Sequence, residues 1–193
     1  LKGHLDMTFE PSGDLETPYV FEETVVGGAV PKNYFPAVEK GLQESVQKGP
    51  LAGYPVVGVK ATLYDGSYHP VDSSEMAFKT ATIQAFKKGF MEAGPILLEP
   101  IASVKVVVPD DYTGDVMGDL NKRRGRVLGM NPIAGGKQEI VADIPMTGLF
   151  GYCTILRSMT GGRGTYSYEF ARYEQAPSDV QEAEIKKRAE EDA

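Results

Sequence analysis

The densest group of cationic side chains in this sequence is Lys122–Arg126, where four of five residues are basic. A guanidinium presents a planar fork of donors that matches a phosphate group, so this group could bind a nucleic-acid backbone. Alternatively, the cations complement the dipole at a helix C-terminus, at roughly 0.3–1 kcal/mol each. Both interpretations stay open. The candidates are Lys122, Arg123, Arg124 and Arg126, with Arg157, Arg163 and Arg172 as weaker ones.

A second candidate binding segment is Gly66–Pro70, which places Tyr68 and His69 between an expected strand and an expected helix. Loops that are held by rigid elements often carry function, although this one could be an ordinary turn. His69, Asp72 and Ser73 could suggest a catalytic triad. The sequence of a nucleophile elbow is absent there, and Asp72 is better interpreted as the N-cap of the next helix.

Other chemistry finds little support in the residues. The sequence has no G-x-x-x-x-G-K-[ST] loop to cradle nucleotide phosphates. Two histidines and one cysteine are few ligands for a zinc site. Cys153 lies among apolar residues of an expected helix, which predicts a small core residue, and a single cysteine fits a reducing cytosol. We therefore expect no catalytic residue, metal or cofactor in this chain.

The net charge of −7 argues at first against nucleic acid as a partner. The acidic excess lies at the two ends, however, because residues 96–177 hold nine basic and nine acidic residues, and six of the basic ones are arginines. A local patch could still bind RNA there. No apolar run is long enough to span a bilayer, and no secretory signal is visible. The chain opens on Leu1 inside an apolar run, which we interpret as a fragment of a longer protein.

Hydrophobic periodicity and turn residues define the elements that position these candidates. In the first half, Asp72 and Glu75 predict a capping box for a long helix that ends at Gly94-Pro95. That pair is the expected domain boundary. We expect strands over Gly3–Phe9, Tyr19–Val26 and Val56–Tyr64, a turn at Asp65–Ser67, and helices over Asn33–Lys48 and residues 73–93.

The second half has a regular alternation of strands and helices. The order βαββαβ predicts a ferredoxin-like arrangement, followed by a charged helix over Ser178–Ala193. We expect strands over Ser103–Val108, Arg126–Ile133, Lys137–Ile144 and Thr165–Tyr173, and helices over Tyr112–Arg124, which would stop at Gly125, and Thr147–Met159.

Two long stretches resemble translation elongation factor G. Phe150–Gly164 resembles the signature near the C-terminus of that family, and Leu51–Phe78 resembles its fourth domain, in the same order along the chain. The resemblance implies an α+β protein of two domains. Residues 1–94 would form an elongated βαβ-containing arm similar to the ribosomal protein S5 domain 2 fold, residues 95–177 a ferredoxin-like fifth domain, and residues 178–193 a C-terminal helix.

The resemblance also implies a function. The arm of such factors enters the decoding region of the small ribosomal subunit and holds tRNA and mRNA during translocation. Its tip would consist of the loops Pro11–Thr17 and Gly66–Asp72, and the fifth domain would lie near ribosomal RNA. The implied contacts are Ser12, Gly13, Asp14, Ser67, Tyr68, His69 and Pro70 at the tip, and Lys122, Arg123, Arg124, Arg126, Arg157 and Arg163 on ribosomal RNA.

In this family GTP and magnesium bind to a first domain that is absent from this sequence. The resemblance thus implies a cytoplasmic, monomeric RNA-docking module with the ribosome, ribosomal RNA and the tRNA–mRNA pair as partners. A ribosomal protection or ribosome-recycling paralogue is an open alternative. A stand-alone enzyme with a ferredoxin-like fold is the alternative of another class, because that fold hosts many activities.

Overall fold

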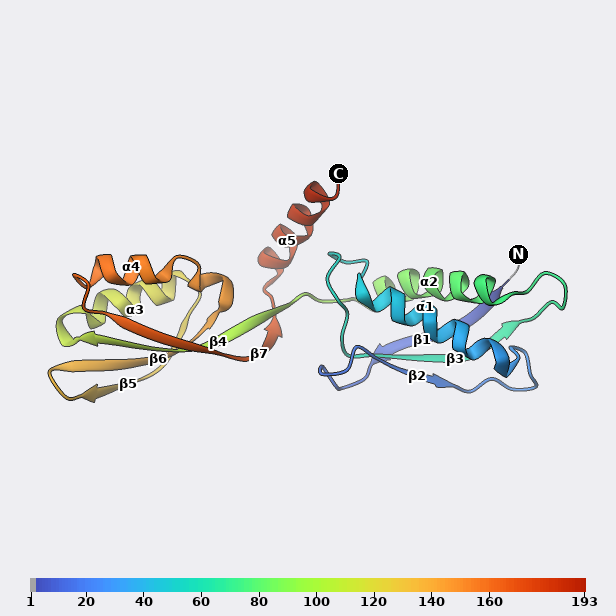
Figure 1. Ribbon diagram of the computed structural model, residues 1–193, viewed down its shortest axis with the longest axis horizontal. Helices are drawn as coiled ribbons and strands as arrows, with labels where there is room; N and C mark the ends of the chain where they lie inside the picture. The colour runs from blue at the N-terminus through green and yellow to red at the C-terminus, as the bar shows by residue number, and fades with distance from the viewer. Residues whose placement is uncertain (1–2) are drawn as a thin grey trace. The chain divides into compact units, whose positions relative to one another are not determined.

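The computed structural model describes residues 3–193 and divides the chain into two compact units (Figure 1). Unit 1 is Leu1–Leu97 with Ser178–Ala193, and unit 2 is Leu98–Pro177. The α+β class with two domains is confirmed. The sequence places the boundary at Gly94-Pro95, whereas the units divide after Leu97. The C-terminal helix groups with unit 1.

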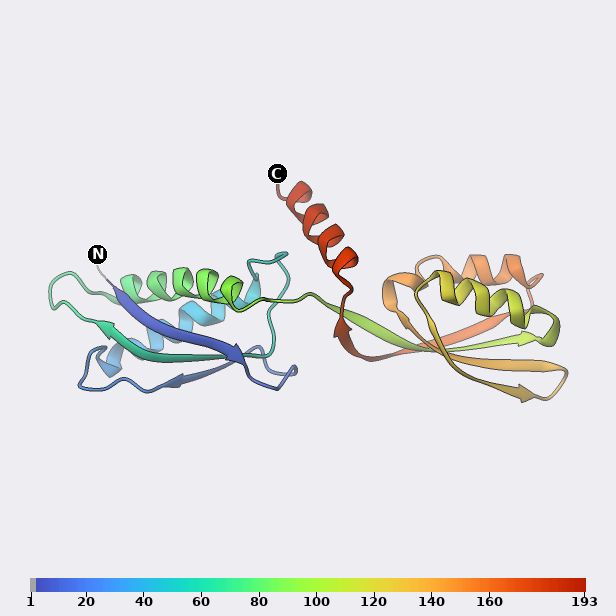
Figure 2. The ribbon, with the colours of Figure 1, turned by 180° about the vertical axis from the view of Figure 1, so that it is seen from behind.

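Unit 1 is a three-stranded sheet with two helices packed along it (Figures 1 and 2). The strand order is β1-β3-β2; β3 pairs antiparallel with β1 and parallel with β2. The elements are β1 (His4–Pro11), β2 (Tyr19–Glu23), the 3-10 turn η1 (Lys32–Tyr34), α1 (Phe35–Gln47), β3 (Val59–Ser67), α2 (Glu75–Glu92) and α5 (Ser178–Glu191).

The apolar stripe of α1 explains why this segment is a helix and where it packs. Val38 and Leu42 are fully buried at a spacing of four, as a core-facing helix requires. They join two core clusters with Phe78 and Phe86 of α2, and Leu63 of β3 is buried in the same way. Each such side chain contributes about 1.5–3 kcal/mol on burial.

The structure corrects the sequence analysis at the start of α2. The N-cap is Ser74, whose hydroxyl accepts the Ala77 N–H at 3.1 Å, so the predicted Asp72–Glu75 capping box is wrong. Asp72 and Ser73 instead belong to a turn that closes on His69. The Ser73 N–H donates to the His69 carbonyl at 2.9 Å.

The predicted turn at Asp65–Ser67 is also wrong, because β3 continues to Ser67, opposite His4. Gly66 permits this extension. A Cβ atom there would lie 2.5 Å from the His4 carbonyl oxygen and 2.6 Å from the Val30 Cγ2 atom. Only glycine lets β1 and the buried Val30 approach the strand so closely.

The C-terminal helix α5 packs against the loop after α1. The Arg188 guanidinium lies 4.3 Å from the centre of the Tyr54 ring, and Gln181 accepts the Leu97 N–H at 2.9 Å. A cation over an aromatic ring is favourable even at an exposed site. These contacts explain why this charged helix groups with unit 1.

Unit 2 is a four-stranded antiparallel sheet with order β5-β6-β4-β7, which confirms the βαββαβ arrangement. Alternate residues of the central strand β4, among them Val104 and Val106, are buried in one cluster with Leu120 of α3 and Leu156 of α4. The elements are β4 (Leu98–Pro109), η2 (Asp110–Tyr112), α3 (Thr113–Lys122), β5 (Arg126–Ile133), β6 (Lys137–Pro145), η3 (Met146–Leu149), α4 (Tyr152–Met159) and β7 (Thr165–Gln175).

The predicted helix Thr147–Met159 is interrupted. Gly151 adopts the left-handed conformation with φ of 69°, and α4 begins only at Tyr152. The buried face of α4 is then Tyr152 and Leu156, at the i, i+4 spacing of one helix side. Cys153 falls off that face and is exposed, so its prediction as a core residue is wrong.

Candidate nucleic-acid interface

The two loops expected at one tip lie at opposite ends of the unit 1 sheet. Pro11 pairs with Val59 at the start of β3, while His4 pairs with Ser67 at its end. β3 has nine residues, which separates the two ends by roughly 26 Å. The prediction that Pro11–Thr17 and Gly66–Asp72 form one tip is therefore wrong.

The parallel pairing of β2 with β3 is the reason. Tyr19 pairs with Val59 and Glu23 with Leu63, so β2 starts beside the start of β3 and ends beside its middle, heading toward Ser67; Val30 then lies against Gly66. Residues 24–31 consequently lie at the His69 end. The sequence analysis gave this segment no functional role; its Gly27-Gly28 pair, with φ of 69° and 70°, is the only local signal of a sharp turn.

The loop at the other end is ordered by its own polar groups. The Thr17 hydroxyl donates to the Asp14 carboxylate at 2.6 Å, and the Glu16 N–H donates to it at 2.9 Å. These bonds hold the pKa of Asp14 below its usual range, with Thr17 the larger cause. RNA contact by Ser12, Gly13 or Asp14 stays a prediction, now for a different end of the sheet.

The His69 loop is exposed but held in a defined conformation. The His69 N–H donates to the Ser73 hydroxyl at 2.9 Å, and the Asp72 N–H donates to His69 Nδ1 at 3.4 Å. Nδ1 is turned toward Asp72, which leaves Nε2 as the ring nitrogen for a partner. The side chain is 58% exposed. The ring is therefore accessible to a partner, and Ser67, Tyr68 and Pro70 beside it are exposed as well.

Charge at this end does not favour phosphate. Residues 1–97 contain no arginine, and Asp65 and Asp72 flank the loop. The Asp72 carboxylate lies 3.5 Å from His69 Nδ1. An RNA contact here would use ring faces and neutral hydrogen-bonding groups, as single-stranded bases and 2′-hydroxyls allow.

In unit 2 the Arg123 side chain is largely internal, with 19% exposure. It donates to the Asp119 carboxylate at 2.9 Å and to the Gly148 carbonyl at 2.7 Å, and it lies 5.1 Å from the centre of the Tyr152 ring. This guanidinium joins α3, η3 and α4. Its geometry favours a structural role, and phosphate contact by Arg123 stays a prediction.

Arg124 ends α3 in an unexpected way. It adopts φ of 63°, the one described non-glycine residue with positive φ. The Gly125 N–H donates to the Leu120 carbonyl at 2.8 Å, which completes a Schellman motif. The predicted helix Tyr112–Arg124 therefore ends two residues earlier, at Lys122, and Arg124 takes the left-handed position expected for Gly125. Position 125 still needs glycine, because a Cβ there would lie 2.7 Å from the Leu120 carbonyl oxygen. The Arg124 guanidinium pairs with both carboxylate oxygens of Glu99.

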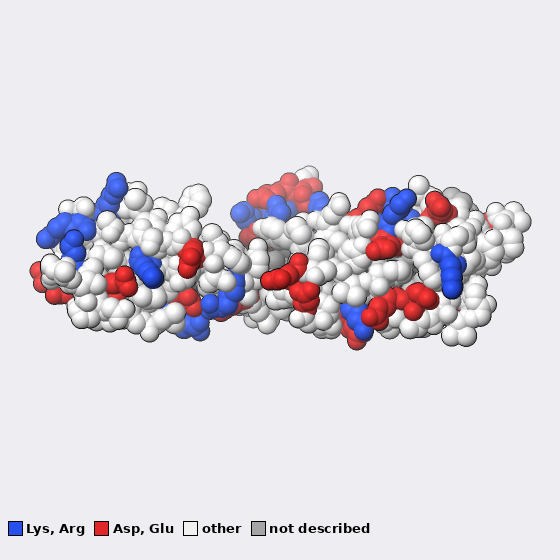
Figure 3. Space-filling model, turned by 60° about the horizontal axis from the view of Figure 1, so that its bottom comes forward, with Lys and Arg blue, Asp and Glu red and all other residues white. Residues whose placement is uncertain are grey.

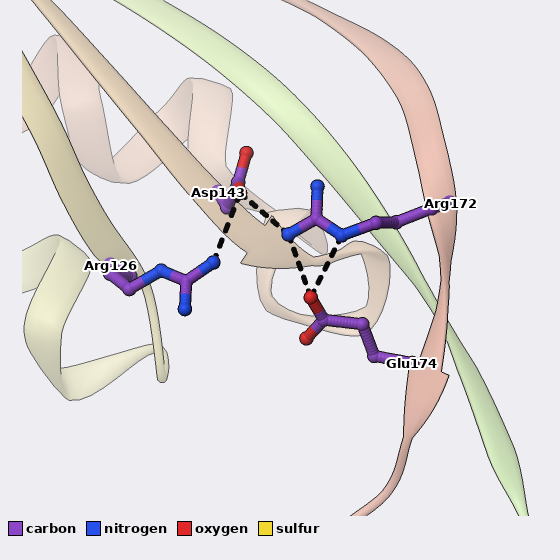
Figure 4. A network of polar contacts seen from close by, with 4 residues as sticks. All are labelled: Arg126, Asp143, Arg172 and Glu174. Atoms are coloured by element: carbon purple, nitrogen blue, oxygen red, sulfur yellow. Dashed lines mark hydrogen bonds and ion pairs between the residues drawn. The ribbon is translucent and has the colours of Figure 1, made fainter.

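Arg126 and Arg172 converge on one carboxylate (Figure 4). Arg172 donates to Asp143 at 2.8 Å and Arg126 donates to the same oxygen at 3.4 Å, while Glu174 accepts from Arg172. The bonds to Asp143 and then to Glu174 raise the pKa of Arg172. Arg126 keeps 66% of its side chain exposed, so it can still reach a phosphate.

The six candidate cations form two separate groups in unit 2. Lys122–Arg126 lie at the C-terminus of α3, whereas Arg157 lies in the last turn of α4 and Arg163 precedes β7, near the start of α3. The Arg163 guanidinium donates to the Tyr112 hydroxyl at 2.6 Å. Figure 3 shows basic side chains gathered at that end of unit 2. Among the described residues, the exposed side chains of Arg157 and Lys122 form no hydrogen bond or ion pair.

Two other kinds of site find no support in the part of the chain that the structure describes. Residues 3–193 contain no group of three or more His, Cys, Asp and Glu that could hold a metal ion. Their helices are also too short or too polar to cross a bilayer.

The fold therefore defines a two-domain α+β protein with a ferredoxin-like second unit. Residues 2–94 match the family model for elongation factor G, domain IV, and residues 96–184 match that for the elongation factor G C-terminus. The chain belongs to the elongation factor G family. Neither matched region is a GTPase domain.

A solved crystal structure of a Thermus thermophilus protein is similar over nearly the whole chain. It is 38% identical in sequence, with a TM-score of 0.78 over 98% of this chain. The match covers 31% of that protein, so this chain spans less than a third of the length of its relative.

We predict that Arg123→Ala destabilises unit 2 by about 2–4 kcal/mol, because it leaves the half-buried Asp119 and the Gly148 carbonyl without their partner. Arg157→Ala, a matched control on an exposed arginine, should change stability by less than about 0.5 kcal/mol. Urea unfolding of both variants measures the difference. Equal stability of the two variants would contradict the structural role of Arg123.

We also predict a loss of stability at alkaline pH that depends on Tyr152. Its ring is fully buried, its hydroxyl has no partner among the described residues, and burial raises its pKa to about 12. The folded state thus favours the neutral phenol. The contribution of this preference to the free energy of unfolding is complete below the pKa of an unfolded tyrosine, about 10. It disappears as the pH rises toward 12.

Tyr152→Phe should flatten the decline between those pH values and change the free energy of unfolding at pH 7 by no more than about 1 kcal/mol. Tyr168→Phe, the same change on an exposed ring, should follow the wild type. Urea unfolding of the wild type and both variants across this pH range measures the free energy of unfolding of each. A Tyr152→Phe protein that declines as steeply as the wild type would refute the assignment.

Proposed function

We propose that this chain is the ribosome-binding part of an elongation factor G-like factor and that it works by docking to RNA. The observation that carries the proposal is the His69 loop. It is exposed at one end of the domain IV unit, yet its backbone is fixed by the hydrogen bond from the His69 N–H to Ser73 at 2.9 Å. A preordered loop loses little entropy on binding, which suits it to a recognition role.

In the proposed role, the His69 end of unit 1 enters the decoding region and holds the tRNA–mRNA pair while it moves. An imidazole can donate to RNA or stack on a base, and neither contact needs a change of charge. Unit 2 docks on ribosomal RNA through its exposed cations, Arg157, Lys122 and Arg126. The factor is cytoplasmic, and GTP with magnesium is bound and hydrolysed elsewhere in the longer protein.

We predict that His69→Ala, in a longer factor that carries this chain, slows tRNA movement by roughly tenfold, the effect of about 1.4 kcal/mol at the loop. Ribosome-stimulated GTP hydrolysis should stay within about twofold of the wild type, because docking through unit 2 is intact. Stopped-flow fluorescence of labelled tRNA and phosphate release measure the two rates.

Ser12→Ala is the matched control, since Ser12 lies in the loop at the opposite end of the same sheet. If only the His69 end works on the tRNA–mRNA pair, Ser12→Ala leaves both rates unchanged, and that result would exclude the RNA contact predicted for Ser12. A parallel fall of both rates in His69→Ala would assign the residue to folding or docking and contradict the proposal. Slow movement with Ser12→Ala but not with His69→Ala would place the working end at the other loop.

A further inference from the structure

Three aromatic rings connect the core of unit 1 to the His69 loop. The ring centre of Tyr34, at the end of η1, lies 4.6 Å from that of Phe78, which is fully buried on α2. It lies 5.6 Å from that of Tyr68, the residue before His69. Aromatic pairs at such separations attract each other beyond the area that they bury. Tyr34 thus stands between a fixed ring and an exposed one.

The other side of the loop is held by α2. The Ser73 hydroxyl accepts the His69 N–H and the Ser73 N–H donates to the His69 carbonyl, both at 2.9 Å. Ser73 precedes the N-cap residue Ser74, so this pair of bonds ties His69 to the start of the helix. The loop is therefore fixed by backbone bonds on one side and by the Tyr34 ring on the other.

Topology brings Tyr34 to this position. It follows residues 24–31, which lie at the His69 end because β2 runs parallel to β3. Burial raises the pKa of the Tyr34 phenol, and the Tyr68 phenol is the second cause. The Tyr34 ring is therefore partly shielded from water, and the exposed Tyr68 ring lies beside it.

We propose that Tyr34 is a positioning residue for the His69 loop. It holds the Tyr68 ring against the core, so that the exposed side of Tyr68 and the His69 imidazole are presented together to an unpaired RNA base. Tyr34 itself is only partly exposed and acts through Tyr68. The use of the loop on RNA rests on the proposed function, whereas the ordering of the loop by Tyr34 does not.

Hydrogen exchange of the full chain tests the ordering. Tyr34→Leu keeps apolar volume but removes the ring pair, and Tyr34→Phe keeps the ring. Tyr64→Leu is the control, since Tyr64 lies on β3 and is 47% exposed. In Tyr34→Leu, exchange of the His69 and Ser73 amides should accelerate on the order of 2- to 10-fold, the strength of one aromatic pair.

Tyr34→Phe and Tyr64→Leu should keep wild-type exchange at both amides, and the β3 amides should stay protected in every variant, which shows that unit 1 is folded. Unchanged His69 and Ser73 exchange in Tyr34→Leu overturns the proposal. If the β3 amides lose protection in Tyr34→Leu, Tyr34→Ile takes its place and is compared with Tyr34→Phe. Faster exchange of the His69 and Ser73 amides in Tyr34→Ile, with the β3 amides still protected, supports the proposal. Exchange at the rate of Tyr34→Phe overturns it.

Binding of the same proteins to purified ribosomes tests the use of the loop. Tyr34→Leu should weaken binding by the same 2- to 10-fold factor as it loosens the loop. The double variant Tyr34→Leu/His69→Ala should lose less affinity than the two single losses combined, because the contribution of His69 depends on the loop that Tyr34 orders. Additive losses would show that Tyr34 acts independently of His69 and overturn its role. A wild-type chain that does not bind ribosomes refutes the proposed function, while the exchange result still decides whether Tyr34 orders the loop.

Discussion

The pairing of β3 with both of its neighbours is the constraint on which the rest of unit 1 depends. Because β3 is antiparallel to β1 and parallel to β2, the chain runs through β2 in the direction of β3, away from the Pro11–Thr17 end and toward the Ser67 end. This arrangement puts residues 24–31, η1 and the His69 loop at one end. It also brings Tyr34 beside Tyr68, although the two are far apart in sequence. A candidate site thus arises from strand direction, which no single segment encodes.

The sequence predicts the elements well where one periodic pattern decides them. The buried stripe of α1 is an example. The strand Arg126–Ile133, which is almost wholly exposed, is predicted instead from the glycines on either side of it. The sequence fails to predict an element where a residue far along the chain determines it. Gly66 continues β3 because β1 and Val30 lie against it. The positions of the two loops, likewise, follow only from the strand register of β1 on β3. The Tyr34–Tyr68 contact has no signal in a single sequence, since it needs the parallel pairing of β2.

Electrostatics divides the cations of unit 2 into internal and available ones. Arg123 and Arg124 look like a binding motif in sequence, yet their guanidinium groups pair with Asp119 and Glu99 and hold the end of α3. Exposed ion pairs contribute little to stability. The Arg123 guanidinium is only 19% exposed and has three partners, so its removal is costly. The cations left for a phosphate are fewer than the sequence suggests, and Arg157 is the clearest of them.

The central claim is that this chain docks to ribosomal RNA through those available cations and the His69 end. Its most direct test is the affinity of the 193-residue chain for purified ribosomes across a salt series. We predict binding that weakens with salt, and a slope of log K against log salt that falls by about 0.7–0.9 in Arg157→Ala but not in Lys187→Ala, an exposed cation on α5. No salt-dependent binding, or equal slopes for the wild type and Arg157→Ala, would contradict the account.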